Sequence, residues 1–422
     1  MEQEQPENLS EILFKPKFDY IETSVISNSG AALPHLEAHD PMLGFASGWY
    51  RPVHRFMWIW SGGNALDIDE ALANIATSHG NRSREDCLDT QKDYGPGNWI
   101  YEFGVVGQRR SVLAAQVAKE GDALKASHHY RMAARYFAIA AYPNLRGDSL
   151  AADAMLLCRR NYRSMIEIDP TDGDLQELTM SDGERKFTAY LHLPDRSSLH
   201  PCVLILGSYE QNITDFYRFY RDALKPRGIA ACVVDLPGLG ASERLDLNSD
   251  TSLIVDKALD CLKELSTIDS TRIGLMGVRV GGTSCMRECL LKPQRVKALV
   301  MLEPAVHSMF TDPRLHGRMQ LCLRSLYANR LNLDASSWET VTPQLQMLSL
   351  KVQGLLSSSA RCKVPCYVSA VENSFTSAED LKLIENSFDS QHIEVLKNQG
   401  KAHFLTHGLD GAAAFLAEKL AD

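Results

Sequence analysis

The stretch RIGLMGVRVGG, residues 272–282, decides the fold of this chain. Its first half has the apolar pattern of a buried strand, and its second half enters a helix through a turn bounded by Gly277 and Gly281. This is the G-x-S-x-G pattern of the sharp turn that presents the nucleophile in many serine hydrolases, but Arg279 replaces the serine. A guanidinium stays protonated and cannot attack a carbonyl, so an ordinary serine mechanism is excluded at this position.

Outward from this turn, residues 171–422 alternate short β-rich runs with helical segments, which predicts a sheet with helices on both faces. The first two runs are joined by a turn at residues 181–183 and are expected to pair antiparallel at one edge. Because the sharp turn follows the fifth run, we predict an α/β-hydrolase fold with an eight-stranded, mostly parallel sheet. The expected strands are residues 175–180, 186–193, 202–207, 229–235, 272–277, 296–303, 364–371 and 392–397.

The chain is long enough for two domains. Residues 1–170 carry apolar side chains at helical spacing over 66–78, 99–119, 123–141 and 151–168, and they predict an N-terminal all-helical domain. An α/β-hydrolase domain is expected to follow at residues 171–422. Residues 304–363, between the sixth and seventh strands, are too long for an ordinary loop and predict a helical, lid-like insert with an amphipathic piece at residues 343–356. The aromatic residues near 49–60 are expected to dock the helical half onto its neighbour, or to bind another protein.

The composition is that of an ordinary globular protein, with 45% hydrophobic and 23% charged residues. A formal net charge of -9 argues against nonspecific binding to nucleic acid or to anionic membranes. The polar, acidic start is unlike a targeting peptide, so a cytoplasmic location is expected. The ten cysteines include no C-x-x-C pair and predict reduced thiols, with no metal site. The glycine-rich turns lack the nucleotide-binding patterns, so no cofactor is expected.

Two further catalytic positions follow from the fold, because the acid should come after the seventh strand and the histidine after the eighth. Asn373 occupies the acid position, with Glu372 beside it. His403 fits the histidine position, and His407 is a weaker candidate. A histidine with neither a serine nor a certain carboxylate does not make a working triad, so His403 is either a functional residue or a remnant of the fold.

Arg279 is better suited to binding an anion, because it lies at a helix N-terminus and its fork can hold a carboxylate or phosphate. A buried guanidinium needs a partner, and Glu210 or Asp235 could provide one, either permanently or until an anionic ligand enters. Ser208, after the third strand, is the best substitute nucleophile, and Ser242 and Ser284 are weaker alternatives. His307, just beyond the sixth strand, is a further candidate for the pocket wall.

Several segments together resemble those of a known family, namely 8–14, 49–51, 57–60, 97–102, 139–143, 235–237, the arginine turn and 349–356. The chain thereby resembles the fermentation–respiration switch proteins (FrsA) across nearly its whole length. The resemblance implies an α/β-hydrolase fold and carboxylesterase activity on simple esters. It also implies binding to the glucose-specific IIA component of the sugar phosphotransferase system and a role in the balance of fermentation and respiration. Members of the family commonly carry an aspartate where this chain has Glu210 and another where it has Asn373.

Two functions remain open at this point. The first is an ester hydrolase in which Arg279 and backbone N–H groups hold the developing oxyanion, with water activated by His403 or Glu210. The second is a regulator that binds a small carboxylic or 2-oxo acid at Arg279 and a protein through its helical half. Removal of carbon dioxide from a 2-oxo acid is a weaker variant, because no electron sink is evident.

Overall fold

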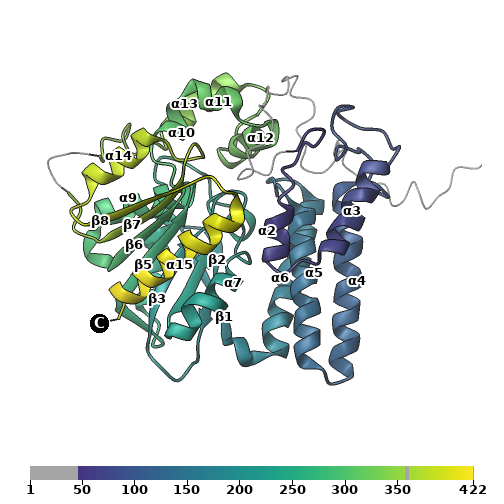
Figure 1. Cartoon of the computed structure of the whole chain (residues 1–422), viewed down its shortest axis with the longest axis horizontal. Coiled ribbons are helices and arrows are strands. Elements are labelled where there is room, and N and C mark those ends of the chain that lie inside the picture. The colour runs from purple at the N-terminus through teal and green to yellow at the C-terminus, as the bar shows by residue number, and fades with distance from the viewer. Residues whose placement is uncertain (1–45, 357–360, 422) are drawn as a thin grey trace, which may run out of the picture.

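A single eight-stranded sheet forms the centre of the α/β part of the molecule (Figure 1), and the computed structural model describes residues 46–356 and 361–421. The spatial order is β1-β2-β4-β3-β5-β6-β7-β8. β2 pairs antiparallel with β1 and β4, and all other pairs are parallel, so the predicted fold class is confirmed. The strands are β1 (Asp174–Asp182), β2 (Arg185–Leu193), β3 (His200–Leu206), β4 (Ala230–Val234), β5 (Ile268–Val278), β6 (Ala298–Leu302), β7 (Cys366–Val371) and β8 (Gln391–Leu396).

The sheet is buried on both faces, as the near-continuous apolar strands require. Along β3, Leu204 and Leu206 pack into one core, whereas Val203 and Ile205 pack into a second core on the opposite face. This alternation follows from the two-residue period of a strand. The first core lies under α8 (Leu253–Lys263) and α9 (Val280–Leu291). The second joins the sheet to α15 (Lys401–Lys419) and to the N-terminal helices.

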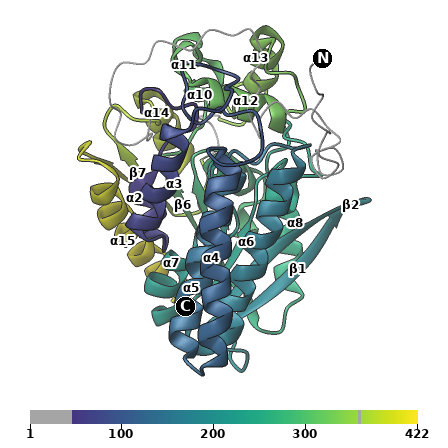
Figure 2. The ribbon, with the colours of Figure 1, turned by 90° about the vertical axis from the view of Figure 1, so that its right-hand side faces the viewer.

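Three long helices stand side by side next to the sheet (Figures 1 and 2): α4 (Trp99–Lys119), α5 (Ala123–Ala141) and α6 (Ser149–Ile168). Asn98 and Asp148 cap the first turns of α4 and α6, because their side-chain oxygens accept hydrogen bonds from backbone N–H groups. Two shorter helices, α2 (Arg55–Trp60) and α3 (Ala65–Thr77), precede them. All four helices expected in this part of the sequence are therefore present.

The insert between β6 and β7 is helical, as predicted, and lies above the sheet in Figure 1. One helix differs from expectation: the amphipathic piece expected at residues 343–356 is instead α13 (Trp338–Gln346), followed by turns. The family-like segment 8–14 and residues 357–360 of the insert lie outside the described residues. The other helices of the insert are α10 (Ser308–Thr311), α11 (Pro313–Arg318) and α12 (Leu321–Arg330).

Two further helices complete the cover of the sheet, namely α7 (Tyr217–Phe219), which continues as a π-helical turn, and α14 (Ala378–Ser387). In the described part of the chain, no helix is long and apolar enough to cross a bilayer.

Candidate functional site

The turn between β5 and α9 has the sharp geometry that the sequence predicts. Arg279 has φ 50° and ψ -114°, a combination that non-glycine residues rarely adopt. A side chain on Gly281 would come within 2.5 Å of the carbonyl oxygens that end β3, and one on Gly277 would meet the backbone of Gly281 and Gly282. The backbone of Arg279 is also fixed, since its N–H donates to the carbonyl of Leu302 at 2.9 Å. The strained turn is thus retained without a serine.

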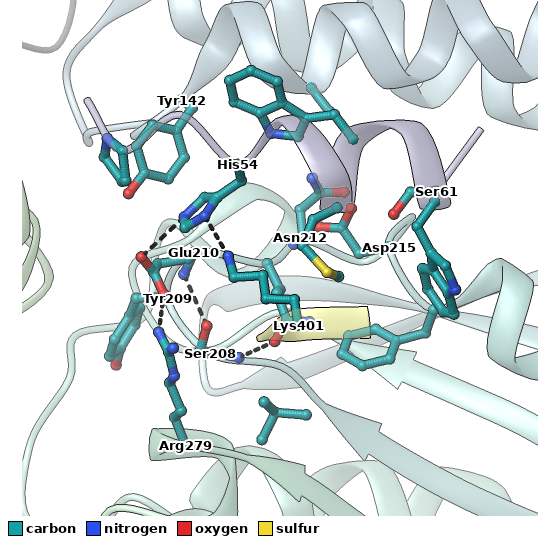
Figure 3. A pocket seen from close by; sticks show the side chains of 18 of the residues that line it. His54, Ser61, Tyr142, Ser208, Tyr209, Glu210, Asn212, Asp215, Arg279 and Lys401 are labelled. Atoms are coloured by element: carbon teal, nitrogen blue, oxygen red, sulfur yellow. Dashed lines mark hydrogen bonds and ion pairs between the residues drawn. The ribbon is translucent and has the colours of Figure 1, made fainter. Parts of the chain in front are cut away.

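Arg279 lines a cavity of about 180 Å³ between the carboxyl ends of the central strands and the N-terminal helices (Figure 3). Residues after β3 and β6 form the sheet side of this cavity. The opposite wall comes from the region of α2 and from α5, and includes Trp60 and Tyr142. The guanidinium of Arg218, on α7, lies 4.6 Å from the centre of the Trp60 ring, so the aromatic segment contacts the α/β half of the chain. The cavity therefore depends on contacts between the two halves of the sequence.

Within the cavity, Arg279 is paired with Glu210 and not with Asp235. Its Nη1 donates to the Glu210 carboxylate, and both side chains are only 12% exposed. The guanidinium also lies 4.8 Å from the centre of the Phe375 ring, a favourable cation–π position. Asp235 instead accepts the backbone N–H of Ala241 at 2.9 Å, and burial raises its pKa to about 7. It is not among the residues that line the cavity.

Two residues that the sequence did not single out extend this ion pair into a row. His54 Nε2 lies 3.5 Å from the Glu210 carboxylate, and Lys401 Nζ donates to His54 Nδ1 at 2.6 Å (Figure 3). We call Lys401, His54, Glu210 and Arg279 the charged row. His54 precedes α2 and Lys401 begins α15, so 347 positions separate them. Lys401 belongs to the same short stretch as His403, which was the available signal. Nothing comparable marked His54.

Electrostatics fix the protonation states in the charged row. Burial lowers the pKa of His54 to about 4, and the charge of Lys401 acts in the same direction against the opposing carboxylate of Glu210. His54 is therefore neutral at pH 7, and its Nε2 proton faces Glu210. Burial by itself would raise the pKa of Glu210, but the charges of Arg279 and its neighbours lower it to about 2. The row therefore holds two cations, one carboxylate and one neutral imidazole.

Glu303, which follows β6, is a further carboxylate in the cavity wall that sequence reasoning did not propose. It is buried, and burial raises its pKa although Arg279 opposes the shift. Its two carboxylate oxygens accept the backbone N–H groups of Val371 and Phe375. Glu303 thereby ties the end of β6 to the loop after β7, and it positions Phe375 against Arg279.

The other predicted residues are scattered. Ser208 lines the cavity, where its hydroxyl accepts the backbone N–H of Glu210 at 3.2 Å, so it positions the loop that carries Glu210. Asn373 is exposed, in a turn with φ 55° after β7, and does not line the cavity. His403 lies in the first turn of α15, where Lys401 and Phe404 reach the cavity wall but His403 does not. His307 contacts Ser349 at 2.8 Å and is also outside the wall.

The sheet, the strained turn and the position of the cavity at the carboxyl ends of the strands define a protein of the α/β-hydrolase fold. Solved structures agree: a 2,6-dihydroxy-pseudo-oxynicotine hydrolase superposes with a TM-score of 0.68 at 17% identity, covering 86% of this chain and 95% of that one. AbyA5 superposes with a TM-score of 0.63 at 16% identity, covering 87% and 98%. At such low identity, these similarities concern the fold alone.

Sequence comparison identifies the family to which the chain belongs. The profile of the family described as "Esterase FrsA-like" matches residues 4–421. Proteins named Esterase FrsA from Yersinia pestis and Yersinia pseudotuberculosis are 36% identical to it over 388 residues, which is 90% of this chain and 91% of theirs. The chain therefore belongs to the FrsA-like esterase family, as its resemblance had indicated.

Proposed function

We propose that this protein hydrolyses carboxylic esters without forming an acyl-serine intermediate. The observation that carries the proposal is Arg279 on the strained turn, facing a cavity in a chain that belongs to an esterase family. At this position the guanidinium and the N-terminus of α9 can stabilise the negative oxygen that develops when an ester carbonyl is attacked. Arg279 thus stabilises the oxyanion, and no acyl-enzyme intermediate is formed.

Water is the nucleophile in this scheme. It adds to the ester carbonyl carbon, the bond to the alkoxy oxygen breaks, and the alcohol leaves with a proton while the acid remains. Of the two bases considered, Glu210 lies in the cavity and His403 does not line it. A carboxylate with a pKa of about 2 is a weak base, so we expect slow turnover that favours esters with good leaving groups.

Hydrolysis of p-nitrophenyl butyrate by the purified protein tests the proposal. We expect measurable hydrolysis that organophosphates do not inhibit, and a loss of about 100-fold in kcat in Arg279→Ala, the scale of losing one oxyanion donor. Arg287→Ala is the matched control, because Arg287 lies on the same helix but pairs with Asp250 outside the cavity. Circular dichroism checks that each variant is folded. Full activity in Arg279→Ala, or a serine labelled by the organophosphate, would contradict the mechanism.

A second candidate is a regulator that binds a small carboxylic or 2-oxo acid. It is favoured by Arg279, whose guanidinium lines the cavity beside Glu210 and can hold an added carboxylate in two places. Calorimetry with short 2-oxo acids tests this candidate, with Arg279→Ala as the variant that should lose binding. If no small acid produces heat on binding while ester hydrolysis is intact, the regulator candidate is rejected and the esterase proposal stands.

The partner proposal rests on the family resemblance. In this proposal, the helical domain at residues 1–170 contacts the glucose-specific IIA component. Through this contact the protein would take part in the balance of fermentation and respiration. Pull-down with the dephosphorylated IIA component tests it, and failure of the purified proteins to associate would count against it.

A further inference from the structure

In Figure 2, α6 runs beside β1 and β2 at the edge of the sheet. Residues of these elements and of the loop after β4 line a second hollow. It is a groove of about 350 Å³, distinct from the cavity that contains Arg279. Strand β2 contributes Lys186, Thr188 and Tyr190 to its lining. These residues share one face of the strand because successive side chains alternate. A volume of this order can accommodate a small molecule.

The α6 wall of the groove is a basic helix face. Arg159, Arg160 and Arg163 lie at positions i, i+1 and i+4, and Leu156 begins the same face one turn earlier. The loop after β4 closes the groove with Arg244 and Glu243. An arginine-rich face directed at a sheet edge is unusual, since a helix normally turns apolar residues toward its neighbours.

The groove is strongly positive in an otherwise acidic protein. Five cationic side chains line it, against the two carboxylates of Glu177 and Glu243, which leaves three positive charges in excess (five minus two). The chain as a whole has a formal net charge of -9. Such a local reversal of sign concentrates anions at one place. The cationic residues are Arg159, Arg160, Arg163, Lys186 and Arg244.

Most of these cations have no ion-pair partner in the described part of the chain. Arg163 pairs with Glu177, but the other four form no ion pair with any residue in the described ranges 46–356 and 361–421. Arginine side chains commonly find carboxylates or carbonyls when they converge. Here the guanidinium groups of three arginines remain available to an added anion.

Tyr190 supplies an independent observation. It lines the groove, is only 1% exposed, and its hydroxyl has no hydrogen-bond partner among the described residues. Burial raises its pKa well above the ordinary value, so the hydroxyl keeps its proton and can donate it. Its ring is held in place by stacking on Tyr162 at 5.7 Å between ring centres. A buried donor without an acceptor, beside cations that form no ion pair in the described ranges, is an arrangement that a bound anion would satisfy.

We propose that this groove binds a small phosphorylated metabolite, with its phosphate held by Arg159, Arg160 and the Tyr190 hydroxyl. A phosphate dianion offers several acceptor oxygens to forked donors, and a monocarboxylate offers fewer. The size of the groove suits a small soluble ligand, and the acidic remainder of the protein would repel a nucleic acid or an anionic membrane. Lys186 and Arg244, from β2 and the β4 loop, lie where they can contact the rest of the ligand.

Calorimetry on the full chain at low ionic strength tests the proposal with inorganic phosphate, pyrophosphate and glycerol phosphate. We expect Arg159→Gln/Arg160→Gln to weaken glycerol phosphate binding by at least about tenfold, since two charge-assisted contacts are lost. Tyr190→Phe removes one neutral donor and should weaken it roughly fivefold. Acetate at matched ionic strength should bind at least about tenfold more weakly than phosphate.

The matched control removes the same charge elsewhere. Lys382 is on α14 and Lys397 follows β8, at the opposite edge of the sheet. The double variant Lys382→Gln/Lys397→Gln should therefore leave the affinity for glycerol phosphate unchanged. Equal weakening by both double variants would indicate nonspecific attraction and overturn the proposal. Binding to vesicles of phosphatidylcholine with phosphatidic acid, without binding to the soluble phosphates, would also overturn it. Unfolding curves confirm that each variant is folded.

Discussion

The pairing of Glu210 with Arg279 makes a quantitative prediction about stability and pH. The pKa of Glu210 falls from an ordinary 4.5 to about 2 in the folded protein. A depressed carboxyl pKa stabilises the folded state above the unfolded pKa and loses this contribution as the pH falls toward the folded value. The difference corresponds to about 3 kcal/mol at pH 7 and about 1 kcal/mol at pH 3. Both side chains are 12% exposed, so solvent screening is limited.

Glu210→Gln removes the charge but keeps the shape of the side chain. We expect the free energy of unfolding, measured in urea, to be about 3 kcal/mol lower than in the wild type at pH 7, and the gap to shrink to about 1 kcal/mol at pH 3. Because the adjacent His54 also titrates, the same comparison is repeated in a His54→Gln background. Glu379→Gln is the control, since its pair with Lys351 is half-exposed and should contribute less than about 1 kcal/mol. A gap that stays constant from pH 7 to pH 3 would refute the reasoning.

Two further predictions concern the same region. Burial lowers the pKa of His54 to about 4, so the folded state resists protonation of this side chain. Between pH 7 and pH 4, the free energy of unfolding of the wild type should therefore fall by about 3 kcal/mol more than that of His54→Gln. Urea unfolding at each pH measures this difference. An equal loss in the variant would show that His54 does not titrate this way. Gly281→Ala would place a Cβ 2.3 Å from the carbonyl oxygen of Leu206, so we expect a loss of about 3 kcal/mol or insoluble protein, whereas Gly95→Ala, which meets nothing within 4 Å, should be near neutral. Thermal unfolding that is unchanged in Gly281→Ala would contradict the tight packing of the turn.

The sequence was sufficient for the fold because the relevant signals are local. The apolar runs, their turns and the helical spacing in the first half predicted each strand and each long helix to within a few residues. The glycines around Arg279 likewise predicted the sharp turn, since the steric reason for them lies within a few positions of the chain. The position of α13 was missed by several residues, because periodicity alone does not mark where a short helix begins.

The site was only partly accessible to the same reasoning. The sequence named Glu210 and Asp235 as equal partners for Arg279, and only the tertiary structure distinguished them, because that choice depends on which loop crosses the cavity. His54 and Lys401 come from opposite ends of the described chain, and their hydrogen bond is invisible in any local pattern.

What the sequence determined by itself was a fixed positive charge on a strained turn, because a guanidinium remains charged in any surroundings and glycine is required wherever backbones touch. The tertiary structure decided which charges surround it, and therefore that His54 is neutral and Glu210 ionised, because pKa values depend on burial and on neighbours brought together through space. The same physical reason applies to the basic groove beside α6. Its arginines are ordinary residues in the sequence, and they become a candidate binding site only because the fold brings them and Tyr190 of β2 to the same groove.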